Sequence, residues 1–189
     1  MSNKEQIIRR IREIQREEGD AVIIGIDGCC ASGKTTIANE IADEFTCNVV
    51  HIDDFYLPFS KRTTDQMERP GGNIDFERLK GEVLTPLIDG HSFEYCPYDC
   101  HADQYFEPKR IRAGECTIIE GSYSCHPAIC QDYSLKIFLT IEKEIQRKRL
   151  RSRNPETMDD FYRLWIPREN LYFLKCHIRE NSNLILNMK

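Results

Sequence analysis

The 189-residue sequence has few of the features that mark membrane, secreted or nucleic-acid-binding proteins. Its uninterrupted apolar runs are only a few residues long, as from Ala21 to Ile24, whereas a membrane-spanning helix needs about 20 apolar residues. The first residues show no apolar stretch of the signal-peptide type. An excess of positive charge is also missing, because 31 acidic residues outnumber 26 basic ones. We therefore expect a cytoplasmic protein that binds neither membrane nor nucleic acid through its overall charge.

Regular cysteine spacing is missing as well. The nine cysteines are an odd number, scattered from Cys29 to Cys176 without the tight pairs of a zinc ribbon. We therefore expect reduced thiols and no structural zinc. The 40% hydrophobic content and the length suit a single domain, residues 1–189, with a full-sized core.

What the sequence does contain is an alternation of short apolar segments with amphipathic ones. Strands are predicted at residues 21–27, 48–52, 116–119, 135–139 and 184–186, and helices at 3–18, 34–45, 75–88 and 142–153. Proline and glycine predict a loop at 53–73, and aromatic residues with prolines predict a small hairpin lobe near 93–111. Such an alternation is typical of an α/β fold with a doubly wound parallel sheet.

A phosphate-binding loop follows the first predicted strand. The segment Gly28-Cys29-Cys30-Ala31-Ser32-Gly33-Lys34-Thr35 matches the Walker A pattern G-x-x-x-x-G-K-[S/T] and opens a predicted helix. Glycines let the backbone N–H groups surround an anion, and the helix N-terminus adds positive potential. We expect Lys34 to reach the β- and γ-phosphates of ATP and Thr35 to bind Mg²⁺, with Thr36 as a second hydroxyl at this turn.

Carboxylates lie at the ends of three predicted strands, where ligands bind in open α/β sheets. Asp27 directly precedes the loop and could brace its backbone. Asp53 is suited to accept the proton of an acceptor hydroxyl, whereas Asp54 should point away from it and could instead cap the following turn. Glu120 ends an apolar run, as does the acid that holds Mg²⁺ in many nucleotide-binding proteins.

These segments together resemble the uridine kinase/phosphoribulokinase group of P-loop kinases, and most closely the bacterial uridine kinase-like proteins. The similarity runs through residues 69–75, 97–100, 120–127 and 165–167, and so spans most of the chain after Ala21. It implies a three-layer P-loop kinase fold with a central parallel sheet. It also implies an N-terminal helix at 1–19, a substrate-binding hairpin lobe at 91–113 and an arginine-bearing lid helix at 142–155.

The resemblance implies a reaction and roles for individual residues. The family transfers the γ-phosphate of MgATP to a primary hydroxyl of a small-molecule acceptor, commonly the 5′-hydroxyl of uridine or cytidine. Asp53 matches the catalytic base, and Glu120 matches the metal-associated acid. The acceptor contacts implied are Asp75 for the ribose, Tyr98 and His101 for the base, and Tyr56 at the end of the Asp53 segment.

The sequence departs from uridine kinases at the acceptor side. No His-Pro-Asp stretch follows Asp75, the spacing from Tyr98 to His101 is short, and the lid lacks Glu-Arg-Gly-Arg. The identity of the nucleobase is therefore open, and pantothenate and nicotinamide riboside are alternative acceptors. A nucleotide-binding regulatory module without metabolite kinase activity is the rival function. The N-terminal helix and the aromatic residues of 93–106 could serve an interface in a homo-oligomer.

Six basic residues lie between Lys143 and Arg153 in this acidic protein. Residues four apart share a helical face, so Arg149 and Arg153 form one face and Arg147 and Arg151 the opposite one. Matching the family lid favours Arg149 and Arg153 as the arginines that stabilise the transferring phosphoryl group. The alternative is an ordinary basic face exposed to water.

Overall fold

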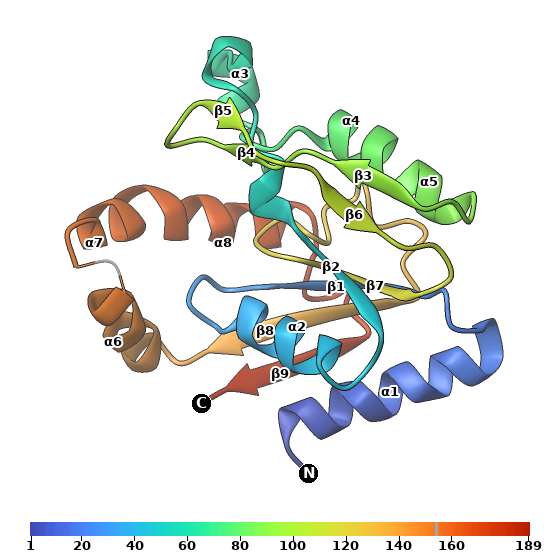
Figure 1. Cartoon of the computed structure of the whole chain (residues 1–189). Coiled ribbons are helices and arrows are strands. Elements are labelled where there is room, and N and C mark those ends of the chain that lie inside the picture. The colour runs from blue at the N-terminus through green and yellow to red at the C-terminus, as the bar shows by residue number, and fades with distance from the viewer. Residues whose placement is uncertain (154) are drawn as a thin grey trace.

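The computed structural model describes residues 1–153 and 155–189, so Asn154, within the predicted lid segment 142–155, lies outside the described residues. A five-stranded sheet with the order β2-β7-β1-β8-β9 forms its centre (Figure 1). The strands are β1 (Ile23–Gly28), β2 (Cys47–His51), β7 (Cys116–Glu120), β8 (Leu135–Ile141) and β9 (Leu184–Met188). All neighbouring strands are parallel, which confirms the predicted sheet.

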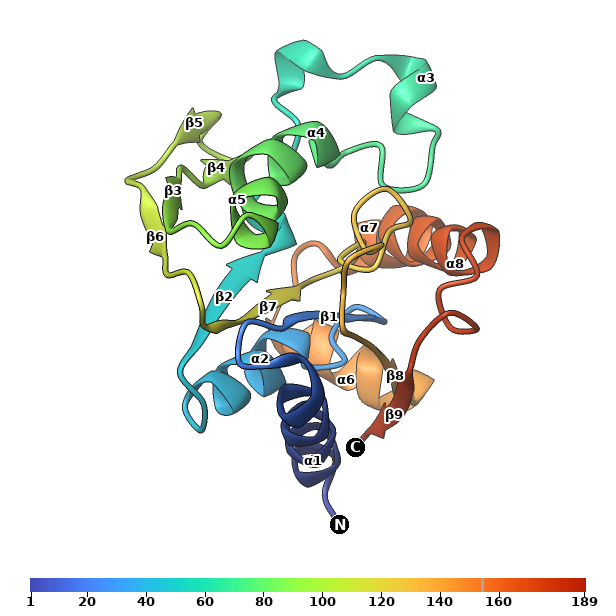
Figure 2. The same cartoon turned by 90° about the vertical axis from the view of Figure 1, so that its right-hand side faces the viewer.

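Helices cover both faces of the sheet and give three layers. Helices α1 (Asn3–Glu18) and α2 (Lys34–Ala42) pack on one face through an isoleucine-rich core that includes Ile11 and Ile37. On the other face lie α8 (Ile166–Lys175) and the helical segment after Asp75, as Figures 1 and 2 show. Helix α2 is shorter than predicted, because hydrogen-bonded turns replace it after Ala42.

The predicted helix at 75–88 is continuous but not uniform. It consists of α4 (Phe76–Leu79), the π-helical turn η3 (Lys80–Leu84) and α5 (Thr85–Ile88). Pro86 has no N–H to donate, and its ring would crowd the carbonyl four residues earlier in a regular helix. The wider π turn before it accommodates this conflict.

The segment predicted as a loop at 53–73 contains three short helical pieces. They are the 3₁₀ helices η1 (Ile52–Asp54) and η2 (Phe59–Lys61) and the helix α3 (Thr64–Met67). The predicted hairpin lobe follows η3 and α5, at the top of Figure 1. In it, β3 (Phe93–Tyr95) pairs with β6 (Lys109–Ile111), and β4 (Tyr98–Asp99) pairs with β5 (Gln104–Tyr105).

Helix α6 (Lys143–Arg153) follows β8, near the end of the sheet where the phosphate-binding loop lies (Figure 1). The chain then forms α7 (Met158–Asp160) and the π turn η4 (Phe161–Trp165), which continues directly into α8. In residues 1–153 and 155–189, no helix combines the length and the apolar character needed to cross a bilayer.

Candidate active site

The predicted phosphate-binding loop joins the end of β1 to the start of α2. Its backbone takes positive φ values at Gly28 (132°), Ala31 (57°) and Gly33 (94°). A side chain on Gly28 would come within 2.1 Å of the Leu139 carbonyl oxygen, so only glycine fits there. Lys34 is buried, and its ammonium group donates to the carbonyl oxygens of Gly28 (2.7 Å) and Cys29 (3.0 Å).

Asp27 lies fully buried beneath this loop. Its carboxylate accepts hydrogen bonds from the Gly28 N–H (2.7 Å), the Cys125 N–H (2.9 Å) and the Tyr172 hydroxyl (2.7 Å). Burial raises the pKa of Asp27 to about 6, against the opposite effect of these hydrogen bonds. Asp27 therefore braces the loop from below and joins it to α8.

Side chains from α6 and α8 hold the outer side of the loop. Arg149, predicted to face the phosphoryl group, donates from Nη1 to the carbonyl oxygens of Ala31 (3.0 Å) and Ser32 (3.3 Å). Its Nη2 donates to the Lys189 carbonyl oxygen at 2.7 Å. The guanidinium group is therefore occupied by backbone carbonyls, whereas the Arg153 side chain is exposed.

The exposure of the arginines on α6 agrees only in part with the two predicted faces. Arg147 and Arg151 are exposed, and Arg149 is half-buried against the loop. Arg153 shares the exposure of the opposite pair, near the end of α6. Sequence reasoning did not single out Gln146 or Glu169, which also touch the loop; their partners are far away in the sequence.

Thr35 and Glu120, the two predicted metal ligands, lie in direct contact. The Thr35 hydroxyl donates to Glu120 Oε1 at 3.0 Å, and Glu120 is only 4% exposed. A hydroxyl and a carboxylate at the phosphate loop are the oxygen ligands that Mg²⁺ prefers, so these two residues fit the ion. Because the structure unites residues 85 positions apart in the sequence, the pair marks one end of the candidate site.

His51 is a further member of this site that sequence reasoning missed. It pairs in register with Glu120 on the neighbouring strand, and its Nδ1 lies 2.5 Å from Glu120 Oε1. The hydrogen bond to Glu120 raises the pKa of His51, although burial acts in the opposite direction. A histidine two residues before Asp53 at the end of a predicted strand was the available signal.

Asp53, the predicted base, lies in η1 just beyond the end of β2. Its side chain is open to solvent, yet enough protein surrounds the carboxyl group for desolvation to raise its pKa. The negative charge of Glu120 raises this pKa further, and a hydrogen bond with the Tyr56 side chain lowers it. Asp53 and Tyr56 thus lie together, and the charges of Glu120 and Lys34 are near enough to shift the pKa of Asp53.

Asp54 points away from Asp53, but not for the predicted reason. We expected an extended segment with alternating side chains; instead η1 is a 3₁₀ helix, in which successive side chains are about 120° apart. The Asp54 carboxylate accepts hydrogen bonds from the Tyr95 hydroxyl (2.7 Å) and from Lys109 (2.8 Å). It therefore ties η1 to the hairpin lobe and does not cap the following turn.

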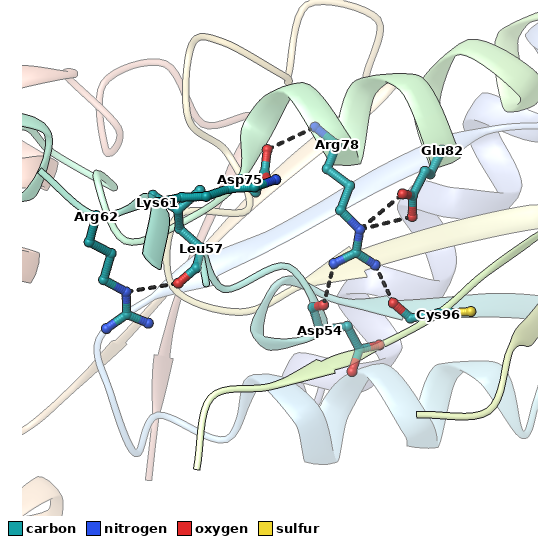
Figure 3. A network of polar contacts seen from close by, with 8 residues as sticks. All are labelled: Asp54, Leu57, Lys61, Arg62, Asp75, Arg78, Glu82 and Cys96. Carbon is teal, nitrogen blue, oxygen red and sulfur yellow. Dashed lines mark hydrogen bonds and ion pairs between the residues drawn. The ribbon is translucent and has the colours of Figure 1, made fainter. Parts of the chain in front are cut away.

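Asp75, the predicted ribose contact, begins helix α4. Its Oδ1 accepts from the Arg78 N–H at 3.1 Å, and its Oδ2 lies 3.9 Å from the Lys61 ammonium group. Figure 3 shows the Arg78 side chain reaching on to Glu82 and to the backbone carbonyls of Asp54 and Cys96. Asp75 thus opens a helix that is fastened to the segment carrying Asp53.

The predicted nucleobase contacts are directed elsewhere. Tyr98 is buried against Tyr105, with ring centroids 5.3 Å apart, and its hydroxyl donates to Asp103. The His101 side chain is exposed, and its backbone N–H donates to Asp99 at 2.7 Å. These two residues are therefore engaged within the hairpin lobe and do not join Asp53 in one polar cluster.

Comparisons with known proteins find similar sequences among kinases. The chain is 26% identical over 136 residues to uridine-cytidine kinase C of Dictyostelium discoideum, which covers 70% of this chain and 30% of that protein. It is 26% identical over 166 residues to nicotinamide riboside kinase of Saccharomyces cerevisiae, covering 75% of this chain and 69% of that one. The chain is thus similar in sequence to proteins named as nucleoside kinases. No protein-family model matches it.

The fold comparison extends over nearly the whole chain. The solved structure of a possible uridine kinase from Bacillus stearothermophilus superposes with a TM-score of 0.67 at 18% identity. The superposition covers 96% of this chain and 99% of that one. This likeness confirms the P-loop kinase fold. The alignment with the Dictyostelium protein spans only about a third of that relative's length.

Proposed function

We propose that the chain is an ATP-dependent kinase that transfers the γ-phosphate of MgATP to a primary hydroxyl of a small-molecule acceptor. One observation carries the proposal: the phosphate-binding loop, the Thr35–Glu120 contact and the Asp53–Tyr56 pair lie at the same end of the parallel sheet. A loop that binds nucleotide without transferring phosphate has no need of a carboxylate base beside it.

Lys34 and the backbone N–H groups of the loop would bind the β- and γ-phosphates. The Lys34 ammonium group, now donating to two loop carbonyls, supplies a fixed positive charge where negative charge develops. Thr35 and Glu120 would hold Mg²⁺, which neutralises phosphate charge. Arg153 is the lid arginine that we expect to add to this stabilisation, because Arg149 is occupied by loop carbonyls.

Asp53 would orient the acceptor hydroxyl and accept its proton. The raised pKa of this carboxyl group, caused by desolvation and by the charge of Glu120, makes it a stronger base than an exposed aspartate. Tyr56, whose side chain lies near enough to Asp53 to lower its pKa, would help to hold the carboxylate in one orientation. This geometry supports proton transfer to Asp53 as the hydroxyl oxygen approaches the γ-phosphorus.

We propose a nucleoside as the acceptor, with its ribose 5′-hydroxyl as the reacting group. The two curated relatives are named for uridine and cytidine and for nicotinamide riboside, which share a ribose and differ in the attached ring. Asp75 is the ribose contact that we retain. The Tyr98 hydroxyl is bonded to Asp103 within its own lobe and the His101 side chain is exposed, so neither gives a reason to favour a particular base.

The test is acceptor-dependent release of ADP from MgATP, measured with uridine, cytidine, nicotinamide riboside and pantothenate. We expect turnover with at least one nucleoside and little without an acceptor. Binding of MgATP without turnover on any of the four would favour the regulatory module. Turnover with pantothenate alone would support the proposed kinase activity and contradict the proposed nucleoside acceptor.

A further inference from the structure

Residue Cys30 of the phosphate-binding loop is held from two sides by buried side chains. Its N–H, in the peptide group before its Cα, donates to Glu169 Oε2 at 2.9 Å, and its carbonyl oxygen, in the peptide group after its Cα, accepts from Gln146 Nε2 at 3.0 Å. Gln146 is 8% exposed and Glu169 is 5% exposed. The two peptide groups that flank Cys30 are therefore each fixed by a side chain that has little freedom to move.

The orientation of the two peptide groups that flank Cys30 matters for the whole loop. Backbone N–H groups can converge on a phosphate only if the carbonyl groups between them point outward and find donors there. Gln146 provides such a donor for Cys30, and Arg149 provides donors for the next two carbonyls. Glu169 accepts the Cys30 N–H, so the peptide between Cys29 and Cys30 is prevented from turning over.

Glu169 has both carboxylate oxygens occupied. Its Oε1 accepts from the Ser122 hydroxyl at 2.6 Å, two residues after Glu120. A buried carboxylate beside an anion-binding loop is unfavourable unless its hydrogen bonds compensate for desolvation and repulsion. Glu169 accepts one hydrogen bond from the loop and one from the turn after β7, and these two bonds provide that compensation.

Gln146 and Glu169 also belong to two different helices, one of which is the predicted lid helix. Gln146 lies on α6, the predicted lid helix, and Glu169 on α8, and Figure 1 shows both helices at the end of the sheet where the loop lies. A displacement of either helix would pull on Cys30. The contacts thus join the shape of the loop to the placement of α6 and α8.

We propose that Gln146 and Glu169 form a two-sided clamp on residue Cys30, through the peptide groups before and after its Cα, that sets the loop in its phosphate-binding shape. Both are positioning residues, since they act through the loop backbone. The proposal rests on the proposed function in one respect, namely that the loop binds MgATP. Gln146 and Glu169, which are far from the loop in the sequence, would then determine the affinity for MgATP. The same hydrogen bonds explain why the buried carboxylate of Glu169 is tolerated beside the loop.

The experiment measures the dissociation constant of MgATP by calorimetry for the wild type and for variants. Glu169→Ala should weaken binding about tenfold to a hundredfold, because a hydrogen bond to a charged group is lost. Gln146→Ala should weaken it about fivefold. Glu169→Gln should stay within about threefold of the wild type, because its amide oxygen can accept from Cys30 while its amide nitrogen donates to Ser122.

The double variant distinguishes a clamp from two unrelated contacts. Once one side of Cys30 is released, the residue can shift and the contact on its other side no longer holds it in place, so the losses should be less than multiplicative. Lys148→Ala, an exposed neighbour on α6, is the matched control and should bind as the wild type does. A merely structural role would lower the unfolding temperature and leave the dissociation constant unchanged well below it.

The outcomes separate the two proposals. A wild type that does not bind MgATP contradicts the proposed function. A wild type that binds, with Gln146→Ala and Glu169→Ala binding equally well, overturns the clamp alone. Multiplicative losses, or a Glu169→Gln variant as weak as Glu169→Ala, overturn it too. If Glu169→Ala fails to fold, Gln146→Ala and Ser122→Ala still decide, since each should weaken MgATP binding.

Discussion

The phosphate side and the acceptor side of this site use their polar groups differently. The loop is held by residues far away in the sequence: Glu169, Gln146 and Arg149 contact residues that lie 116 to 139 positions earlier. On the acceptor side, Asp75 and Tyr98 bond to partners only three and five positions away. Hydrogen bonds from residues far away in the sequence fix the loop in one conformation. Hydrogen bonds between near neighbours can instead be replaced by bonds to a ligand with little change in the rest of the fold.

This difference suggests that the phosphate side is already organised for its ligand and that the acceptor side is not. A preorganised site stabilises developing charge without rearrangement. An acceptor site whose carboxylate and hydroxyl are engaged locally must give up those bonds on binding. Substitutions should therefore affect the rate most on the phosphate and base side, and should affect acceptor affinity on the other.

The largest effect is expected for Asp53→Asn. Asparagine keeps the shape of aspartate but cannot accept the proton, and general-base contributions are typically 10²–10⁴-fold. We expect kcat to fall by about that factor, while the dissociation constant of MgATP stays within a few-fold. Turnover by coupled ADP release and binding by calorimetry would measure the two.

Asp54→Asn is the matched control for this prediction. Its carboxylate bonds to Tyr95 and Lys109 in the hairpin lobe, so the variant should lose stability more than rate. If Asp54→Asn were the inactive enzyme and Asp53→Asn the active one, the base would be misassigned. The preorganised region would then extend into the hairpin lobe.

Lys34→Ala is expected to rank next. We expect the ammonium group to act as a fixed cation at the phosphates, and loss of one preorganised donor typically reduces rates by about 10²–10³-fold. The same change removes a buried charge that is bonded to Gly28 and Cys29, so circular dichroism should accompany the kinetics. Near-normal kcat in a folded variant would show that this loop is not the catalytic phosphate site.

Much of the phosphate side was predictable from the sequence, because its signals are contiguous. The Walker A segment, the strand before it and the helix after it occupy one stretch of chain, and the apolar runs located all five strands of the sheet. Local rules do not reveal which distant residues complete the loop, so Gln146 and Glu169 were missed. Arg149 was favoured by its match to the family lid, but its guanidinium group meets loop carbonyls.

The acceptor side was less predictable for a different reason. Residues such as Tyr98 were chosen by resemblance to short segments, and a short polar segment can satisfy its own hydrogen bonds. Asp103, which takes the Tyr98 hydroxyl, was not considered. The roles of Asp53, Asp75 and the lid arginines stay predictions.

Asp75→Asn tests whether the acceptor side binds the acceptor at all. Asparagine caps helices about as well as aspartate, so stability should change by less than about 0.5 kcal/mol. Loss of a charged hydrogen-bond acceptor should still raise the KM for the nucleoside about tenfold and leave the KM for ATP unchanged. Asp75→Ala should show the same KM effect with about 1 kcal/mol of additional instability.

An unchanged nucleoside KM in Asp75→Asn would mean that this carboxylate is only a helix cap. The acceptor would then be held by other groups. The two sides would differ in whether their predicted residues bind a ligand, as well as in how those residues are held in the fold. Removing the ribose 2′-hydroxyl from the substrate gives an independent measurement. It should weaken binding to the wild type more than to Asp75→Asn.

The smallest effect is expected at His126, which connects the two sides. Its ring stacks on Phe76 of α4 (4.3 Å between centroids) and lies parallel to Tyr172 of α8 (5.9 Å), whose hydroxyl bonds to Asp27 beneath the loop. Its Nδ1 accepts from the Ala128 N–H at 3.1 Å, which requires the unprotonated nitrogen. Burial, followed by the charge of Lys80, lowers the pKa of His126 from 6.5 to about 4.

The lowered pKa sets the sign of the pH dependence. Between pH 6.5 and pH 4 the unfolded chain binds a proton at His126 that the folded chain does not, so stability falls as the pH falls through this range. After allowance for partial exposure, the loss is about 1–2 kcal/mol, or about 3–6 °C in Tm. Asp27, with its raised pKa, has the opposite dependence, so only a difference between variants isolates the histidine.

His126→Asn supplies that difference, because its side-chain oxygen can still accept from the Ala128 N–H and does not titrate. Melting curves at pH 7 and pH 4.5 should show a smaller fall in Tm for the variant than for the wild type. Equal falls would mean that this histidine is protonated in the folded protein, and that the stack between α4 and α8 is no barrier to charge. The two sides would then be joined chiefly through Arg78 and the segment that carries Asp53.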